Sequence, residues 1–313
     1  MSSKNQTGLV TRYQAGYYVV QIGNETLVCK LRGRLKHGPA VGDLVAIGDM
    51  VHFLRLSDGT GVIEKVEPRR RALVRMSPTL KGVYEQVLLA NPDQAVLVFS
   101  CAKPEPHLRM LDRFLVICER EDIPPLIVAN KVDLIGLPAA REIFAAYPPL
   151  GYPVIFTSAV SREGVDALHD LLKGKISAFA GPSGVGKTSL LNAIQPQLGK
   201  KVKTVSKATS KGRHSTVVRE LIPLESGGYV ADLPGLRALE LWDIEPEELD
   251  GYFPELRPLV QFCQFNDCTH RSEPGCAVRQ AVSEGKVNPE RHESYLRMRF
   301  GDPLDNGISN DLA

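Results

Sequence analysis

One octapeptide, GPSGVGKT at positions 181–188, constrains the fold of this 313-residue chain more than any other feature. It fits the pattern G-x-x-x-x-G-K-[ST], follows the apolar run 176–180 and opens a helix-compatible run at 189–194. Glycines let such a loop curl, so that successive N–H groups and the helix N-terminus face a phosphate. The sequence therefore predicts an α/β fold in which a strand, a phosphate loop and a helix follow one another.

The same loop supplies the side chains that triphosphate chemistry needs. Lys187 adds a positive charge, which makes it a candidate catalytic residue, and Thr188 offers a hydroxyl to Mg²⁺. Kinases and ATPases share this motif, so it does not identify the base. The residues expected to bind nucleotide here are Gly181, Pro182, Ser183, Gly184, Val185, Gly186, Lys187, Thr188 and Ser189.

Base selectivity is predicted from Asn130-Lys131-Val132-Asp133, which follows the apolar strand Leu126 to Ala129. The Asp133 carboxylate can accept both the N1–H and the exocyclic amine of guanine, a donor pair that adenine lacks. Asn130 and Lys131 complete this loop. The alternative, a plain turn closed by Asn and Asp, does not explain why both motifs occur in one chain. We therefore expect GTP and GDP as ligands.

Two further loops complete the expected nucleotide site. Thr157-Ser158-Ala159 follows the strand Pro153 to Phe156 and would place backbone N–H groups, with Ser158 and Ala159 as the binding residues, near guanine O6. Asp232-Leu233-Pro234-Gly235 ends another strand, so Asp232 is expected to hold the Mg²⁺ water shell and the Gly235 N–H to contact the γ-phosphate.

A basic stretch from Lys200 to Arg219, without an acidic residue, lies between these phosphate motifs. Its length and polarity favour a mobile switch, in which Ser215 or Thr216 binds Mg²⁺ and the γ-phosphate, with Thr216 preferred. An ordinary solvated loop is the alternative. The position after Gly235 holds Leu236 where many GTPases have a water-orienting glutamine. We expect His214 to orient the attacking water; alternatively it contacts RNA or its own loop.

Motif order indicates a circular permutation, because the base loop at 130–133 precedes the phosphate loop, the reverse of a regular GTPase. Four apolar runs mark strands of a parallel sheet, at 94–100, 126–129, 176–180 and 228–231. The predicted domains are an N-terminal barrel over 1–71, a permuted GTPase domain over 72–238 and a helical domain over 239–313.

Alternating apolar and polar positions in short, glycine-broken runs between residues 8 and 67 indicate a small antiparallel barrel. It carries eleven Lys/Arg against six Asp/Glu up to Arg71. Such an excess of base fits either RNA contact or a solvated face. Whole-chain charge, with 38 Lys+Arg against 36 Asp+Glu, identifies no partner.

Four potential metal ligands fall within fourteen residues as Cys263-x4-Cys268-x-His270-x5-Cys276. Three thiolates and one imidazole make a complete tetrahedral set for Zn²⁺, which predicts a structural site. A cysteine-lined core or a redox pair is the alternative. Cys29, Cys101 and Cys118 are isolated and are expected to be small buried hydrophobic residues.

Together these motifs resemble the RsgA/YjeQ family of bacterial GTPases that depend on the small ribosomal subunit. The resemblance rests on NKVD before GPSGVGKTS, the stretch Gly212-Arg213-His214-Ser215-Thr216, the DLPG turn, the barrel and the Cys/His cluster. It implies an OB-fold barrel, hydrolysis stimulated by the small subunit, rRNA contact and a role late in subunit maturation. The family usually has a run of threonines after the histidine, where this chain has Ser215-Thr216-Val217.

Two other functions remain open from the sequence. One is an RNA-binding scaffold with a regulatory nucleotide pocket, and the other is a P-loop kinase, against which Asp133 argues. Residues 1–6 have no apolar signal core, and the longest apolar runs are too short to cross a bilayer. We expect a cytoplasmic monomer that binds neither membrane nor DNA.

Overall fold

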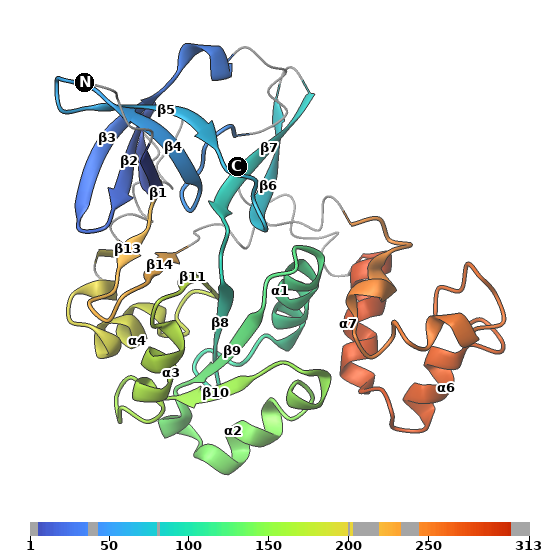
Figure 1. Ribbon diagram of the computed structural model, residues 1–313. Coiled ribbons are helices and arrows are strands. Elements are labelled where there is room, and N and C mark those ends of the chain that lie inside the picture. Colours follow the sequence, from blue (N-terminus) through green and yellow to red (C-terminus); the bar gives the residue numbers. More distant parts are fainter. Residues whose placement is uncertain are drawn as a thin grey trace.

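A computed structural model describes residues 6–36, 43–79, 82–199, 201–202, 219–232 and 244–301. Three parts succeed one another along the chain: a β-barrel, a central α/β unit and a C-terminal helical unit (Figure 1). In the part of the chain that is described, no helix combines the length and hydropathy needed to cross a bilayer.

The N-terminal barrel is built from β1 (Gln6–Gln14), β2 (Tyr17–Ile22), β3 (Glu25–Leu31), β4 (Met50–Arg55) and β5 (Gly61–Val66). The strands run in the order β1-β2-β3-β5-β4, and β4 pairs back onto β1 to close the barrel. Alternate side chains point inward, among them Val10, Val20, Val51 and Phe53, which are fully buried. The predicted barrel is confirmed, but it is not wholly antiparallel, because β3 and β5 pair in parallel.

A short strand from far along the chain extends this barrel sheet. β12 (Arg219–Glu220) pairs antiparallel with β1, on the side opposite β2. The sequence analysis placed Arg219 at the end of a mobile or solvated stretch, but the structure fixes it in a strand. Two residues give too little periodicity to predict a strand.

An antiparallel hairpin, β6 (Ala72–Thr79) and β7 (Gly82–Ala90), joins the barrel to the α/β unit. Its base touches the barrel, because Ala90 N–H donates to Ile47 O at 2.9 Å and Asn91 Nδ2 donates to Gly48 O at 3.1 Å. This hairpin is not part of the parallel sheet predicted for the region after residue 72.

The central sheet has the strand order β10-β9-β8-β11-β14-β13. Its bounds are β8 (Gln94–Ser100), β9 (Pro125–Asn130), β10 (Val154–Thr157), β11 (Ile176–Ala180), β13 (Ile222–Pro223) and β14 (Tyr229–Asp232). All neighbours are parallel except β13, which pairs antiparallel with β14 at the edge. The helices are α1 (Leu108–Arg120), α2 (Leu137–Ile143), α3 (Val165–Leu172) and α4 (Lys187–Ile194).

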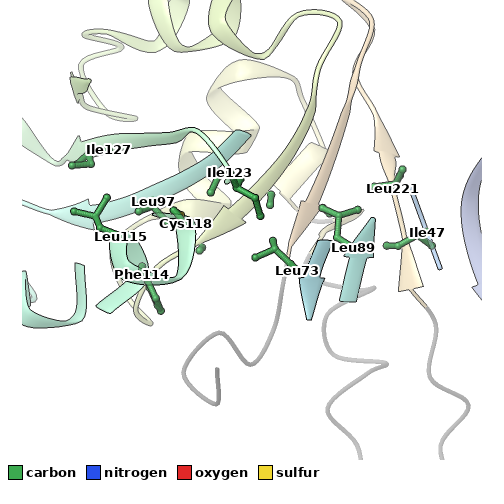
Figure 2. Close-up of a cluster of buried hydrophobic side chains, with 14 of the residues drawn as sticks. Ile47, Leu73, Leu89, Leu97, Phe114, Leu115, Cys118, Ile123, Ile127 and Leu221 are labelled. Atoms are coloured by element: carbon green, nitrogen blue, oxygen red, sulfur yellow. The ribbon is translucent and has the colours of Figure 1, made fainter. Parts of the chain in front are cut away.

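Every residue of β8 is buried, as expected of a central parallel strand covered on both faces. Leu97 and Phe99 face α1 and pack with Leu115, whereas Val96 and Val98 lie in the core that holds α3 and α4. The first core runs on toward the barrel (Figure 2). Cys29, Cys101 and Cys118 are all buried, as predicted. Burial raises the pKa of Cys118 to about 12.

The C-terminal unit consists of two 3-10 turns, η5 (Leu249–Tyr252) and η6 (Val260–Phe262), and two helices, α6 (Ala277–Ser283) and α7 (Pro289–Phe300). Asn288 caps α7 by accepting hydrogen bonds from the N–H groups of Glu290 and Arg291. The core of this unit centres on Phe253 and Tyr295, whose rings meet edge to face at 5.6 Å.

Helix α7 packs beside α1 of the central unit (Figure 1). There Arg291 donates to Asp112 at 2.7 Å and to Glu255 at 2.7 Å, and all three side chains are buried. Tyr147 also donates to Asp112, at 3.0 Å. Burial, followed by the neighbouring Asp112 carboxylate, raises the pKa of Tyr147, so its hydroxyl remains a donor. A buried ion cluster therefore joins the C-terminal unit to the central unit.

Candidate functional site

The phosphate loop lies where β11 ends and α4 begins, at the carboxyl edge of the parallel sheet, where α/β proteins bind ligands. Gly181 has φ +143°, and a Cβ there would lie 2.0 Å from Val98 O. Gly186 has φ +96°, and a Cβ there would lie 2.5 Å from Asn130 Nδ2. Only glycine fits both positions, because the loop runs so close to two neighbouring strands.

Lys187 is the first residue of α4, and its ammonium group folds back across the loop. Its Nζ atom donates to Gly181 O at 2.6 Å and to Pro182 O at 2.9 Å. The charge is thus held over the concave side of the loop, where a phosphate group would take the place of these carbonyl partners. Thr188 follows in the first turn of the helix.

The predicted base loop contacts the phosphate loop directly. Asn130 ends β9 and is buried; its Nδ2 atom donates to Val185 O at 2.8 Å. Lys131, with φ +66°, donates from Nζ to Gly184 O at 2.6 Å and also to Lys103 O. The two motifs are remote in sequence but lie against each other in the structure, as they must if one nucleotide is to contact both.

Asp133 lies in a 3-10 turn, η2 (Val132–Leu134), with its side chain exposed at the rim of the site. Its charge acts on Cys101, whose pKa is raised to about 11 by burial first and by Asp133 second. Because the Asp133 side chain is exposed, its carboxylate is accessible to a ligand from solvent.

The third loop, 157–159, is tied to the base loop by a side-chain contact that the sequence analysis did not predict. Thr157 is buried and donates from Oγ1 to Asn130 Oδ1 at 3.0 Å. Ser158 donates its own N–H to Glu163 O at 3.0 Å, and its hydroxyl accepts from Val160 N and Ser161 N. Among the described residues of this loop, Ala159 keeps an N–H without a protein acceptor, so it is the amide available to a ligand.

The magnesium side of the site is described only in part. Asp232 ends β14, and its backbone pairs with Phe179 of β11, two residues before the phosphate loop. Gly235, His214, Ser215 and Thr216 lie outside the described residues, so their predicted roles remain predictions.

A second site lies in the C-terminal unit, where Cys263, Cys268, His270 and Cys276 bring their ligand atoms within 4.8 Å of one another. His270 Nδ1 is 3.6 Å from Cys263 Sγ and 3.4 Å from Cys276 Sγ, and the two sulfur atoms are 4.0 Å apart. Zn–S and Zn–N bonds of about 2.3 and 2.0 Å give tetrahedral edges of about 3.5 to 3.8 Å. The donor set therefore fits a zinc ion.

The surroundings of this cluster support metal binding. His270 is fully buried, and its Nε2 atom is 3.1 Å from Asp250 Oδ2, the carboxylate–histidine arrangement that orients a ligating imidazole. The N–H of Arg279 lies 3.5 Å from Cys276 Sγ. Burial raises the pKa of Cys268 to about 12, so a metal ion would have to displace the thiol protons. The sequence analysis did not assign Asp250.

The predicted base loop precedes the phosphate loop in the chain yet contacts it in space, which is the arrangement of a circularly permuted P-loop GTPase. The family description "RsgA GTPase" matches residues 66–242, and "RsgA N-terminal domain" matches residues 7–63. The chain belongs to the RsgA GTPase family, as its motifs suggested, and is a GTP hydrolase.

Similar proteins match along almost the whole chain. A small ribosomal subunit biogenesis GTPase RsgA from Gemmatimonas aurantiaca is 45% identical over 94% of this chain and 96% of its own. One from Moorella thermoacetica is 42% identical over 92% and 94%. The crystal structure of YjeQ from Thermotoga maritima superposes with a TM-score of 0.77 at 36% identity, covering 95% of this chain and 98% of that one. YloQ, described as a circularly permuted GTPase, gives 0.71 at 32% identity over 95% and 94%.

Proposed function

We propose that this protein acts in the biogenesis of the small ribosomal subunit and hydrolyses GTP to GDP and phosphate when it binds that subunit. The relatives that support the biological role bear the name of that process. The hydrogen bond from Asn130 to Val185 supports guanine nucleotide as the ligand, because it joins the base loop and the phosphate loop into one site.

Within this site each predicted residue receives a role. Asp133 recognises the guanine N–H groups, the stem of Lys131 borders the base, and the Ala159 amide faces guanine O6. The phosphate loop and Lys187 hold the β- and γ-phosphates, while Thr188 and Asp232 hold magnesium. When bound, Mg²⁺ neutralises charge that builds up on the phosphate oxygens. Gly235 and one hydroxyl, from Ser215 or preferably Thr216, complete the γ-phosphate contacts.

Water orientation falls to His214 in this proposal, because Leu236 occupies the position of the usual glutamine. His214 belongs to the basic stretch before β12, so its placement depends on how that stretch is held. Turnover of the protein alone should be slow, and binding to the subunit should accelerate it.

Contact with rRNA is assigned to the outer face of the barrel. A shallow groove of about 400 Å³ there is lined by Arg12, Gln14, Ala15, Tyr17, Val19 and Val28. Strand register places Tyr17 beside Lys30, and Lys30 Nζ lies 5.1 Å from the centre of the Tyr17 ring. An aromatic ring that is 47% exposed and flanked by cations fits an unpaired base with its phosphate.

The C-terminal unit would hold one structural zinc ion through Cys263, Cys268, His270 and Cys276. Four protein ligands fill the coordination shell, which is typical of a site that stabilises a fold. The protein is further proposed to be a cytoplasmic monomer whose nucleic-acid partner is rRNA and not DNA.

GTP hydrolysis measured with purified small subunits, large subunits or free rRNA tests the proposal. We expect phosphate release to rise with small subunits alone. A scaffold with a regulatory pocket would release no phosphate with any of these additions. A kinase would bind ATP in competition with GTP. Tyr17→Ala should weaken subunit binding without altering hydrolysis by the free protein, and because the lost side chain is uncharged the fold-loss should change little with salt.

A further inference from the structure

The basic stretch that holds His214 and Thr216 ends on the barrel. In β12, Arg219 pairs with Tyr13 of β1 and Glu220 pairs with Arg12. Leu221 N–H then donates to Thr11 O at 2.8 Å. The chain that leaves the phosphate-binding unit at α4 is therefore held by the barrel before it returns to the central sheet at β13.

Arg219 strengthens this attachment with its side chain, which is only 15% exposed. Its Nη1 atom donates to Val87 O at 2.8 Å and to Asp43 Oδ2 at 3.2 Å. The same Asp43 oxygen accepts the Val87 N–H at 3.1 Å. A single guanidinium thus connects the barrel, the β6–β7 hairpin and the end of the basic stretch.

Asp43, which accepts the hydrogen bond from Arg219, is in turn held in place by Arg69. Arg69 donates to Asp43 O at 3.0 Å and reaches both oxygens of Asp49, at 2.8 Å each. Asp49 is fully buried and accepts the Ala46 N–H at 2.7 Å. Because Arg69 links Asp43 to the fully buried Asp49 next to β4, the residues that hold Arg219 are themselves attached to the barrel.

The attachment also borders the proposed RNA groove. Arg12 lines that groove, and its Nε atom is 3.9 Å from Glu220 Oε2 in the neighbouring strand. An RNA phosphate that drew Arg12 outward would therefore change the charge balance beside β12.

We propose that Arg219 is a positioning residue for subunit-stimulated GTP hydrolysis. It fixes to the barrel one end of the stretch that contains Thr216 and His214, which lies five positions before Arg219 in the sequence, so barrel contacts with the subunit would act on hydrolysis through this end. This inference rests on the proposed function and names the route by which the subunit acts on the site.

The test is single-turnover GTP hydrolysis by Arg219→Ala with saturating small subunits. Stimulated hydrolysis should fall about tenfold, while unstimulated hydrolysis, GDP affinity and subunit binding stay within about twofold of the wild type. Arg219→Lys, which keeps the charge beside Asp43, should recover part of the rate. If Arg219 only stabilised the fold, Arg219→Ala would lower the stimulated and the unstimulated rates of hydrolysis by the same factor.

Asp43→Asn provides a second route should Arg219→Ala disturb the barrel edge. It removes the charge but keeps the acceptor for Val87 N–H, and its effect should not add to that of Arg219→Ala. Arg141→Ala, at an exposed arginine of α2, is the matched control and should behave as the wild type.

If small subunits stimulate the wild type and also stimulate Arg219→Ala and Asp43→Asn normally, the role of Arg219 is wrong while the proposed function stands. An equal fall in stimulated and unstimulated rates also overturns that role. If small subunits do not stimulate the wild type, the proposed function fails as well.

Discussion

Asn130 donates a 2.8 Å hydrogen bond to the carbonyl of Val185, 55 residues further along the chain. The bond connects the loop predicted to recognise the base with the loop predicted to hold the phosphates, so the two loops form one continuous surface. It also explains Gly186, where any side chain would collide with the Asn130 amide.

The Thr157 hydroxyl should be needed to hold this bond. Thr157→Val removes the donor to Asn130 Oδ1 and leaves a buried oxygen unpaired, which costs about 1 to 3 kcal/mol and should weaken GDP binding by up to about 150-fold. Thr157→Ser keeps the hydroxyl and should bind nearly normally. Titration with a fluorescent GDP analogue compares the two, and equal affinities for the Val and Ser variants would contradict this role.

Asp133 should determine the choice of base. Asp133→Asn replaces one acceptor oxygen with a donor, so GTP affinity should fall by about a hundredfold. Xanthosine triphosphate, which carries an oxygen at C2, should then bind better than GTP. Asp166→Asn, at an exposed acid of α3, is the control for loss of one surface charge. Unchanged preference for GTP in Asp133→Asn would place base recognition elsewhere.

Zinc should depend on the cluster and on Asp250. Cys276→Ser should lower bound zinc, measured by elemental analysis, from about one ion per chain to nearly none, whereas Cys101→Ala should retain it. Asp250→Ala removes the carboxylate that orients the His270 ring and should weaken zinc retention against a chelator by about 10- to 100-fold. Full zinc content in Cys276→Ser would exclude the proposed ligand set.

Arg291 should stabilise the contact between α7 and α1. Arg291→Met leaves the buried Asp112 without its cation and should cost about 3 to 5 kcal/mol of unfolding free energy in urea. Asp112→Asn in the same chain should recover part of that loss. Arg297→Met, on the same helix, removes a more exposed pair with Glu293 and should cost under about 1 kcal/mol. If Arg291→Met and Arg297→Met lowered the unfolding free energy by the same amount, the buried cluster would contribute no more to stability than the exposed ion pair.

The sequence predicted those parts of the fold and site that local chemistry determines. Short motifs reveal such features within a few residues of sequence. Examples are glycines in the phosphate loop, the lysine at the start of its helix, and cysteines and a histidine at the spacing of metal ligands. The apolar runs also predicted the barrel and the strands of the central sheet, because alternation and continuous burial are periodic signals.

Contacts between remote segments left no such mark. Thr157 meets Asn130, Asp250 meets His270 and Arg291 meets Asp112 only because the chain folds back on itself. Thr157, Asp250 and Arg291 are ordinary polar side chains in their own neighbourhoods of sequence, so nothing local singled them out. β12 was missed for a related reason, since a two-residue strand is defined by its partner and not by its own composition.

The short passage from β12 to β13 has a structural consequence. A single residue, Leu221, separates a strand of the barrel from a strand of the central sheet, and it is buried in the core that also contains Ile47 and Leu89 (Figure 2). The chain thus crosses between the two bodies here as well as at the hairpin. Because β12 belongs to the barrel sheet and β13 to the central sheet, cutting out the barrel together with β12 would also cut the segment that leads into the edge strand of the central sheet.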